Sequence, residues 1–186
     1  MRDWAKTKVH FLGIGGSGMS GIARIMIARG AHVSGSDIQD SPSLAGLRSI
    51  GATVLIGHKA SNLGNVDFVV RSSAIAHDNV EISEAHNRGI AVLERAEALA
   101  SLMEGATSVA IAGTHGKTTT TSMLTVALQH CGLDPSFSIG ATVRNSGTNA
   151  HHGSGDIFVV EADESDGSFI AYQPHGAVIT NIELDH

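Results

Sequence analysis

Aromatic side chains and positive charge are both scarce in this sequence. Phenylalanine, tyrosine and tryptophan make up 4% of its 186 residues, and the formal net charge is −6, with 12 lysines and arginines against 18 acids. Single-stranded nucleic acids are bound by stacked aromatic rings in a basic groove, and duplexes by a basic patch. The composition therefore argues against a nucleic-acid partner. An anionic ligand would have to be held mainly by backbone N–H groups and a few cations.

Cysteine, proline and long apolar runs are also rare or missing. Cys131 is the single cysteine, so no internal disulfide can form and a reducing compartment is expected. No run approaches the roughly 18 apolar residues of a membrane helix, and the N-terminal MRDWAKTK lacks an apolar signal core. These absences predict a cytoplasmic protein without membrane insertion. Glycine, by contrast, occurs 22 times against 3 prolines, which suits the tight turns of an α/β fold.

The stretch Ser108–Thr121, which reads SVAIAGTHGKTTTT, has the layout of a phosphate-binding loop. In such a loop the N–H groups at a helix start point at an anion, the lysine reaches the outer phosphates, and the next hydroxyl ligates Mg²⁺. The generic motif also has a glycine at the position that Ile111 holds here. A plain polar turn with a solvated lysine would not explain why glycines, lysine and threonines share one turn. The predicted phosphate site comprises Gly113, Thr114, His115, Gly116, Lys117, Thr118 and Thr119.

A second glycine-rich turn follows the first expected strand, Lys8–Leu12. Its sequence, GIGGSG, fits G-x-G-x-x-G in a strand–turn–helix setting, where the glycines allow a tight turn and the approach of a pyrophosphate. Ser72 and Ser73 follow the fourth expected strand and would lie at the same carboxyl edge of the sheet, although a solvated loop is an equal alternative. The predicted diphosphate site comprises Gly13, Gly15, Gly16, Ser17, Gly18, Met19, Asp37, Ser72 and Ser73.

Asp37 ends the second expected strand, where such folds place an acid that bonds a ribose hydroxyl. The alternative is a turn or helix-capping residue. Ser41 and Ser43 lie close by and can cap the next helix instead, which favours the ribose role for Asp37.

Apolar runs and helical patterns alternate along the chain, and this alternation predicts parallel, doubly wound α/β sheets. We place the domain seam at Glu104–Thr107, after which the pattern restarts, and expect one domain over residues 1–104 and a second over 105–186. The expected strands are Lys8–Leu12, Ala31–Gly35, Thr53–Ile56, Asp67–Val70, Ile90–Leu93, Val109–Ala112, Pro135–Ala141, Asp156–Val160 and Ala177–Thr180. The expected helices are Met19–Arg29, Ser43–Ile50, Val80–Arg88, Arg95–Met103 and Lys117–His130.

Glu161 comes directly after an apolar strand, where a phosphate-loop domain is expected to place a carboxylate beside Mg²⁺. The segment Arg144–Gly155 is expected to be a loop, and its adjacent histidines, His151 and His152, are interpreted as solvated rather than metal-binding. Cys131 is assigned to packing. The helical spacing of the phosphate-loop helix predicts a core face made of Met123, Leu124, Ala127 and Leu128.

Three motifs in the second half, together with the N-terminal glycine turn, resemble the Mur ligases of peptidoglycan synthesis. They read AGTHGKTTTT at 112–121, EADESD at 161–166 and TNIELDH at 180–186. The resemblance covers nearly the whole chain and includes the missing first glycine of the phosphate loop. The wording, with GIGGSGMSGIA and SGSD, is most similar to members that join L-alanine to UDP-N-acetylmuramate.

The resemblance implies a Rossmann-like parallel sheet domain that binds the diphosphate of a UDP-sugar, followed by an incomplete P-loop α/β ATPase domain that binds ATP and Mg²⁺. It assigns phosphate contacts and catalysis to Lys117, and the metals to Thr118, Glu161 and His186. The implied reaction forms an acyl phosphate from the substrate carboxylate and ATP, which the amine of L-alanine attacks. Two Mg²⁺ ions and Lys117 would stabilise the negative charges that meet there.

Family members continue far beyond the last motif, so the resemblance also implies an N-terminal portion that by itself is inactive as a ligase. Four alternatives remain at this stage. They are a dinucleotide-dependent oxidoreductase, a P-loop switch, a non-catalytic UDP-sugar-binding module, and a ligase that recycles a murein peptide onto the same UDP-sugar. The sequence determines neither amino-acid preference nor oligomeric state.

Overall fold

The structure is a computed structural model that describes residues 2–144, 146–163 and 168–183. The chain divides into two compact units, Met1–Ala98 and Leu99–His186. Each unit contains a five-stranded sheet with its own core, so the α/β class predicted from the sequence is confirmed. Within the described ranges, no helix combines the length and the apolar character needed to cross a membrane.

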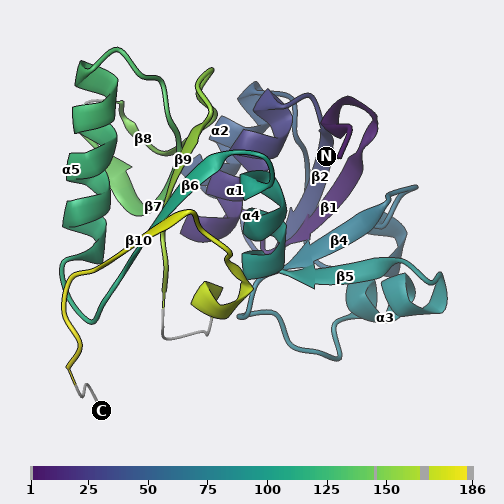
Figure 1. Cartoon of the computed structure of the whole chain (residues 1–186). Coiled ribbons are helices and arrows are strands. Elements are labelled where there is room, and N and C mark those ends of the chain that lie inside the picture. The colour runs from purple at the N-terminus through teal and green to yellow at the C-terminus, as the bar shows by residue number, and fades with distance from the viewer. Residues whose placement is uncertain (1, 145, 164–167, 184–186) are drawn as a thin grey trace. The chain divides into compact units, whose positions relative to one another are not determined.

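The first unit is built on a parallel sheet with strand order β3-β2-β1-β4-β5 (Figure 1). The chain moves outward from the central strand β1 to β2 and β3, then returns to the other side of β1 and continues through β4 to β5. The helices α1 and α2 pack against each other, and α3 packs against β5 and the short helix η2. The elements are η1 Trp4–Lys6, β1 Lys8–Leu12, α1 Ser17–Ala28, β2 His32–Asp37, α2 Pro42–Ser49, β3 Thr53–Ile56, η2 Ala60–Asn62, β4 Phe68–Arg71, α3 Val80–Asn87, β5 Ala91–Glu94 and α4 Arg95–Met103.

Local sequence accounts for where several of these helices begin. Ser41 is the N-cap of α2, and its hydroxyl accepts the N–H of Leu44 at 3.3 Å. Asn79 caps α3 in the same way, accepting the N–H of Glu81 at 2.8 Å. The prediction that a serine, and not Asp37, caps α2 is therefore confirmed, so the Asp37 carboxylate at the end of β2 does not serve as the cap of that helix.

The second unit has strand order β10-β6-β9-β7-β8, with β8 antiparallel at one edge and the other pairs parallel. The long helix α5 packs against β6, β7 and β9 (Figure 1). The boundary between the units falls inside α4, before the seam predicted at Glu104–Thr107. The elements are β6 Thr107–Ala112, α5 Lys117–His130, β7 Ser136–Val143, β8 Thr148–His151, β9 Ile157–Glu161, η3 Ser168–Ala171 and β10 Gly176–Ile179.

The buried face of α5 differs from the predicted one. Met123 is 68% exposed, whereas Thr121 and Thr125 are fully buried, and Leu124 and Leu128 pack on the core. The hydroxyls of the two threonines donate to backbone carbonyls one turn earlier, at 2.7 and 2.8 Å. A threonine whose hydroxyl is satisfied within its own helix can enter an apolar core through its methyl group. The prediction for Met123 and Ala127, which are both exposed, was wrong because the spacing of apolar residues does not show that threonines can fill the buried face.

The segment predicted as a loop, Arg144–Gly155, contains the strand β8. Gly147 adopts φ of +65° and its N–H donates to the carbonyl of Val143, which closes a hairpin between β7 and β8. His151 on this strand contacts Asp134, with Nε2 3.0 Å from Oδ1. A hairpin therefore replaces the expected solvated loop. Cys131, which the sequence analysis assigned to packing, is exposed at the end of α5.

Candidate nucleotide and diphosphate sites

The predicted phosphate loop is the turn between β6 and α5. Gly116 precedes the helix with φ of +83°, a left-handed conformation that favours glycine. The helix begins at Lys117, so the N–H groups of its first turn lack acceptors within the helix. The Lys117 ammonium lies over the loop and donates to the carbonyls of Gly113 at 2.6 Å and Thr114 at 3.3 Å. Helix-start N–H groups and an ammonium at one turn are an arrangement that binds phosphate.

Strand β9 brings Glu161 to the same edge of the sheet, where it pairs in register with Ile111 of β6. The Thr118 hydroxyl donates to Glu161 Oε1 at 2.8 Å, and the N–H of Gly140 donates to Oε2 at 2.7 Å. Both carboxylate oxygens are thereby oriented by groups from other elements. The two described side chains that the sequence predicted to share a metal are in direct contact.

The residues at this edge fit a Mg²⁺ ion. Mg²⁺ prefers oxygen ligands and, in phosphate sites, takes only one or two from the protein. Thr118 and Glu161 supply a hydroxyl and a carboxylate at one point. Among the residues the structure describes, no cluster of three or more histidine, cysteine or acidic side chains is assembled as a ready metal cage. His186, the third predicted ligand, lies outside the described residues.

Two residues after β10 contact the phosphate loop and were not singled out by the sequence analysis. The Thr180 hydroxyl donates to the carbonyl of His115 at 2.6 Å, and Asn181 Oδ1 accepts the N–H of His115 at 2.9 Å. The imidazole of His115 is itself 64% exposed, 3.9 Å from the Glu183 carboxylate. The TNIELDH motif was the available signal, but the sequence does not indicate which of its residues reach the loop.

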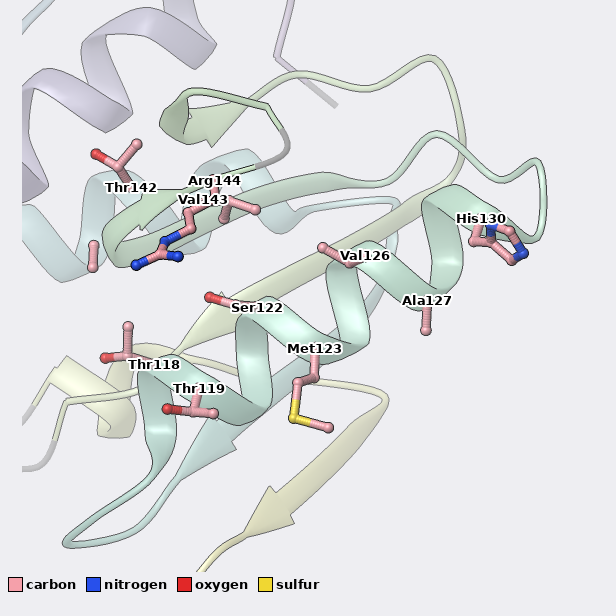
Figure 2. Close-up of a pocket in the computed structure, with 11 residues that line it drawn as sticks. Thr118, Thr119, Ser122, Met123, Val126, Ala127, His130, Thr142, Val143 and Arg144 are labelled. Atoms are coloured by element: carbon pink, nitrogen blue, oxygen red, sulfur yellow. The ribbon is translucent and has the colours of Figure 1, made fainter.

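A cavity of about 700 Å³ runs along α5 from this edge. In Figure 2, Thr118 and Thr119 lie near the start of α5 and His130 at its far end, with Arg144 on the segment across the cavity. Met123, Val126 and Ala127 give the cavity an apolar wall. Arg144 brings a positive charge to a space that the predicted metal ligand Thr118 also lines.

In the first unit, the glycine turn joins β1 to α1 and is held by β2. The N–H groups of Gly13 and Ile14 donate to the carbonyl of Ser36, and the N–H of Gly15 donates to Asp37 Oδ2 at 2.9 Å. The other oxygen of Asp37 accepts the N–H of Ile38 at 2.8 Å. Asp37 thus orients the turn, and each carboxylate oxygen keeps further lone pairs for a ligand hydroxyl.

The remaining predicted diphosphate residues lie around the same turn. Ser72 is adjacent to it, since a Cβ placed on Gly13 would lie 3.3 Å from the Cβ of Ser72. Ser73 is exposed beyond it. Gly16 and Ser17 are exposed at the start of α1, while the side chain of Met19 is 2% exposed and belongs to the core. A ligand would therefore meet Met19 only through its backbone.

Gly18 and Arg95 are also neighbours at this turn. A Cβ on Gly18 would lie 3.1 Å from Cδ and 3.2 Å from a terminal nitrogen of Arg95, both within the first unit. The third glycine of the motif therefore makes room for an arginine side chain, in addition to the tight turn that the sequence analysis expected. Arg95 adds a guanidinium close to the predicted diphosphate site, and the sequence analysis missed it because α4 lies 77 positions after Gly18.

A buried charged residue, Glu81, lies behind the glycine turn. Its carboxylate accepts hydrogen bonds from the Ser36 hydroxyl at 2.6 Å, from Asn62 at 2.6 Å and from the N–H of Lys59 at 3.0 Å, with His10 Nε2 at 3.3 Å. Burial raises the pKa of Glu81, but the hydrogen bonds outweigh it and lower the pKa from 4.5 to about 2. The carboxylate is therefore ionised and ties β1, β2, η2 and α3 together.

Known proteins resemble the chain along most of its length. Residues 8–107 match the Mur ligase family, catalytic domain, and residues 111–186 match the Mur ligase middle domain. A curated UDP-N-acetylmuramate–L-alanine ligase from Salinispora arenicola is 57% identical over 178 residues, which is 96% of this chain and 35% of that protein. The chain therefore spans about a third of the length of this relative.

Two solved structures share the fold. A UDP-N-acetylmuramate:L-alanyl-γ-D-glutamyl-meso-diaminopimelate ligase from Neisseria meningitides has a TM-score of 0.89 and 32% identity, covering 97% of this chain and 62% of that one. A UDP-N-acetylmuramate–alanine ligase from Thermotoga maritima has a TM-score of 0.86 and 33% identity, covering 97% of this chain and 42% of that one. Both chains are longer than this one.

Proposed function

The chain belongs to the Mur ligase family, and we propose that it forms part of an ATP-dependent ligase that joins L-alanine to UDP-N-acetylmuramate in peptidoglycan synthesis. The first unit would bind the UDP-sugar and the second would bind ATP. The observation that carries the proposal is the assembly of Lys117, Thr118 and Glu161 at one phosphate loop. The 57% identity to a curated L-alanine ligase supports the choice of substrate.

The phosphate loop would bind and orient the nucleotide. The N–H groups at the start of α5 would hold phosphate oxygens, and the Lys117 ammonium, now on two loop carbonyls, would move to the transferring phosphoryl group. Thr118 and Glu161 would hold Mg²⁺, which when bound neutralises phosphate charge. Placing a cation where two anionic reactants meet lowers the barrier to their approach, because their repulsion is otherwise largest at that point.

The reaction would proceed by transfer of the γ-phosphoryl of ATP to the substrate carboxylate, giving an acyl phosphate and ADP. The amine of L-alanine would then attack the carbonyl carbon, and phosphate would leave with its oxygen. In this scheme the first unit positions the UDP-sugar through the glycine turn, with Asp37 on the ribose and Ser72 beside the diphosphate. ATP and a UDP-activated sugar are cytoplasmic metabolites, so we place the reaction in the cytoplasm.

Another member of the same family is the alternative supported by a specific observation. The solved structure with a TM-score of 0.89 is a ligase for L-alanyl-γ-D-glutamyl-meso-diaminopimelate, so a peptide could replace L-alanine as the attacking amine. Both reactions use the same UDP-sugar and the same phosphate loop. The residues described above therefore do not distinguish them, and identity to the curated relative favours L-alanine.

The deciding experiment is a phosphate-release assay with the full-length ligase, ATP, Mg²⁺ and UDP-N-acetylmuramate. L-Alanine is expected to stimulate release, whereas the tripeptide is not. Tripeptide-dependent release without alanine-dependent release would establish the recycling ligase instead. Release that requires neither the UDP-sugar nor an amine would contradict both. Calorimetry with the 186-residue chain and UDP-N-acetylmuramate tests the first unit separately from catalysis.

A further inference from the structure

The phosphate loop lacks the first glycine of the generic motif, and the structure gives the reason. Ile111 occupies that position, is fully buried in β6, and its carbonyl accepts the N–H of Ala162 at 2.8 Å. A residue that is paired in the sheet and packed in the core cannot belong to a loop that wraps a phosphate. The loop must therefore be shaped by something other than its own glycine at 111.

The segment after β10 shapes the loop. The Thr180 hydroxyl donates its single proton to the carbonyl of His115 at 2.6 Å and lies 3.2 Å from the carbonyl of Ala112, which accepts the Thr180 N–H at 3.0 Å. Asn181 accepts the N–H of His115 through Oδ1 at 2.9 Å and the N–H of Thr114 through its backbone carbonyl at 3.3 Å. Two consecutive residues thus hold the loop from Ala112 to His115.

Gly113 is fitted to this contact. Its φ is +128°, and a Cβ there would collide with the Thr180 hydroxyl and lie 2.9 Å from the carbonyl of Asn181. Position 113 requires glycine because Thr180 fills the space that a side chain would occupy. In addition, L side chains rarely adopt this φ. The loop and the segment 180–181 are therefore complementary surfaces, although about 65 positions separate them in the sequence.

We propose that Thr180 and Asn181 are positioning residues for the nucleotide, a clamp that presets the phosphate loop and withdraws the His115 N–H from phosphate binding. The inference rests on the proposed ATP-binding role of the loop. With His115 N–H held by Asn181, the phosphates are bound by the N–H groups of Gly116, which precedes α5, and of Lys117 and Thr118, which begin it. A preset loop binds more tightly because its ordering cost is met during folding.

The test compares substitutions that keep or remove one group in the 186-residue chain. Thr180→Ser keeps the hydroxyl, while Thr180→Val removes it at similar volume. Asn181→Ala removes the acceptor for His115. Amide hydrogen exchange of His115, without nucleotide, reports the clamp directly. We expect Thr180→Val and Asn181→Ala to weaken Mg²⁺-ATP binding by about tenfold, as for loss of one or two hydrogen bonds, with Thr180→Ser near the parent. Exchange at His115 should rise by a similar factor in Asn181→Ala.

UDP-N-acetylmuramate affinity is the control, since the glycine turn lies in the other unit and should be unaffected. The proposal would be overturned if amide exchange at His115 were unchanged in Asn181→Ala. It would also be overturned if the affinity for Mg²⁺-ATP were unchanged in both Thr180→Val and Asn181→Ala. Should the unsubstituted chain fail to bind ATP, the ATP-binding role of this loop would fail while His115 exchange still decides whether the loop is held. A variant that also loses UDP-sugar affinity would indicate general unfolding and contradict a local positioning role.

Discussion

The Ser36 hydroxyl donates a 2.6 Å hydrogen bond to the carboxylate of Glu81, which is completely buried. The same hydroxyl oxygen, Ser36 Oγ, lies 2.9 Å from His58 Nδ1. Because the single Ser36 proton goes to the carboxylate, His58 Nδ1 must donate its own proton to Ser36. The buried charge therefore makes Nδ1 the nitrogen of His58 that donates to Ser36, as well as linking β2 to α3.

We expect the buried carboxylate of Glu81 to make the stability of the first unit fall at acidic pH. Its pKa falls from 4.5 in the unfolded chain to about 2 in the folded one, so its stabilisation is complete above pH 4.5 and is lost as the pH falls towards 2. The difference corresponds to about 3 kcal/mol. Urea unfolding of the first unit, followed between pH 6 and 2.5, should show this loss. Glu81→Gln should destabilise the unit at pH 7 and flatten the pH dependence, whereas Glu84→Gln on the same helix should do neither. An unaltered pH profile in Glu81→Gln would contradict the assignment.

Substitution of Asp37 is expected to lower the affinity for the UDP-sugar specifically. Removal of its carboxylate in Asp37→Ala frees the Gly15 N–H and deletes the proposed ribose acceptor, so binding should weaken by about 10- to 100-fold, as for hydrogen bonds to a charged group. Isothermal calorimetry with UDP-N-acetylmuramate measures this. Asp40→Ala is the matched control, because that acid is exposed and pairs with Arg48 at 2.9 Å. Equal affinity in the Asp37 variant and the control would exclude Asp37 from the site.

Substitution of Lys117 is expected to lower the turnover of the full-length ligase. Lys117→Ala removes the cation over the loop, and such preorganised electrostatic groups contribute about 10²- to 10³-fold in rate. Steady-state phosphate release with saturating substrates gives the comparison. Lys6→Ala, at a residue whose side chain is 86% exposed, should leave turnover unchanged. Turnover of Lys117→Ala within a few-fold of the parent enzyme would refute the assigned role.

Substitutions of Thr118 and of Glu161 are both expected to raise the Mg²⁺ concentration that nucleotide binding requires. Thr118→Val deletes a hydroxyl that contacts Glu161 at 2.8 Å, so the Mg²⁺ concentration for half-maximal nucleotide binding should rise by about tenfold, as for one oxygen ligand or its support. Thr118→Ser keeps the hydroxyl and should remain near the parent. Glu161→Gln should produce a similar or larger rise. If the serine and valine variants respond to Mg²⁺ alike, the hydroxyl is not part of the metal site.

The sequence by itself determined most of the helices and strands and the chemistry of the loops, although it missed the strand β8. The strand β1 and the helix α5 have the bounds that apolar runs and glycines predicted, because these signals act within a few residues. The same local logic placed Lys117 and Thr118 at a helix start. The sequence also indicated Asp37 as an acid beside the glycine turn, since consecutive βα units bring strand ends to one edge.

Only the tertiary structure decided which distant groups meet those loops. The clamp of Asn181 on His115, the carboxylate of Asp37 on Gly15, and the space that Gly18 leaves for Arg95 join residues 22 or more positions apart. Such contacts depend on strand order and register, which local patterns do not encode. The buried threonines of α5 have the same origin. A hydroxyl bonded to its own helix hides the polar group, and only the packing of α5 on its sheet shows which face is covered.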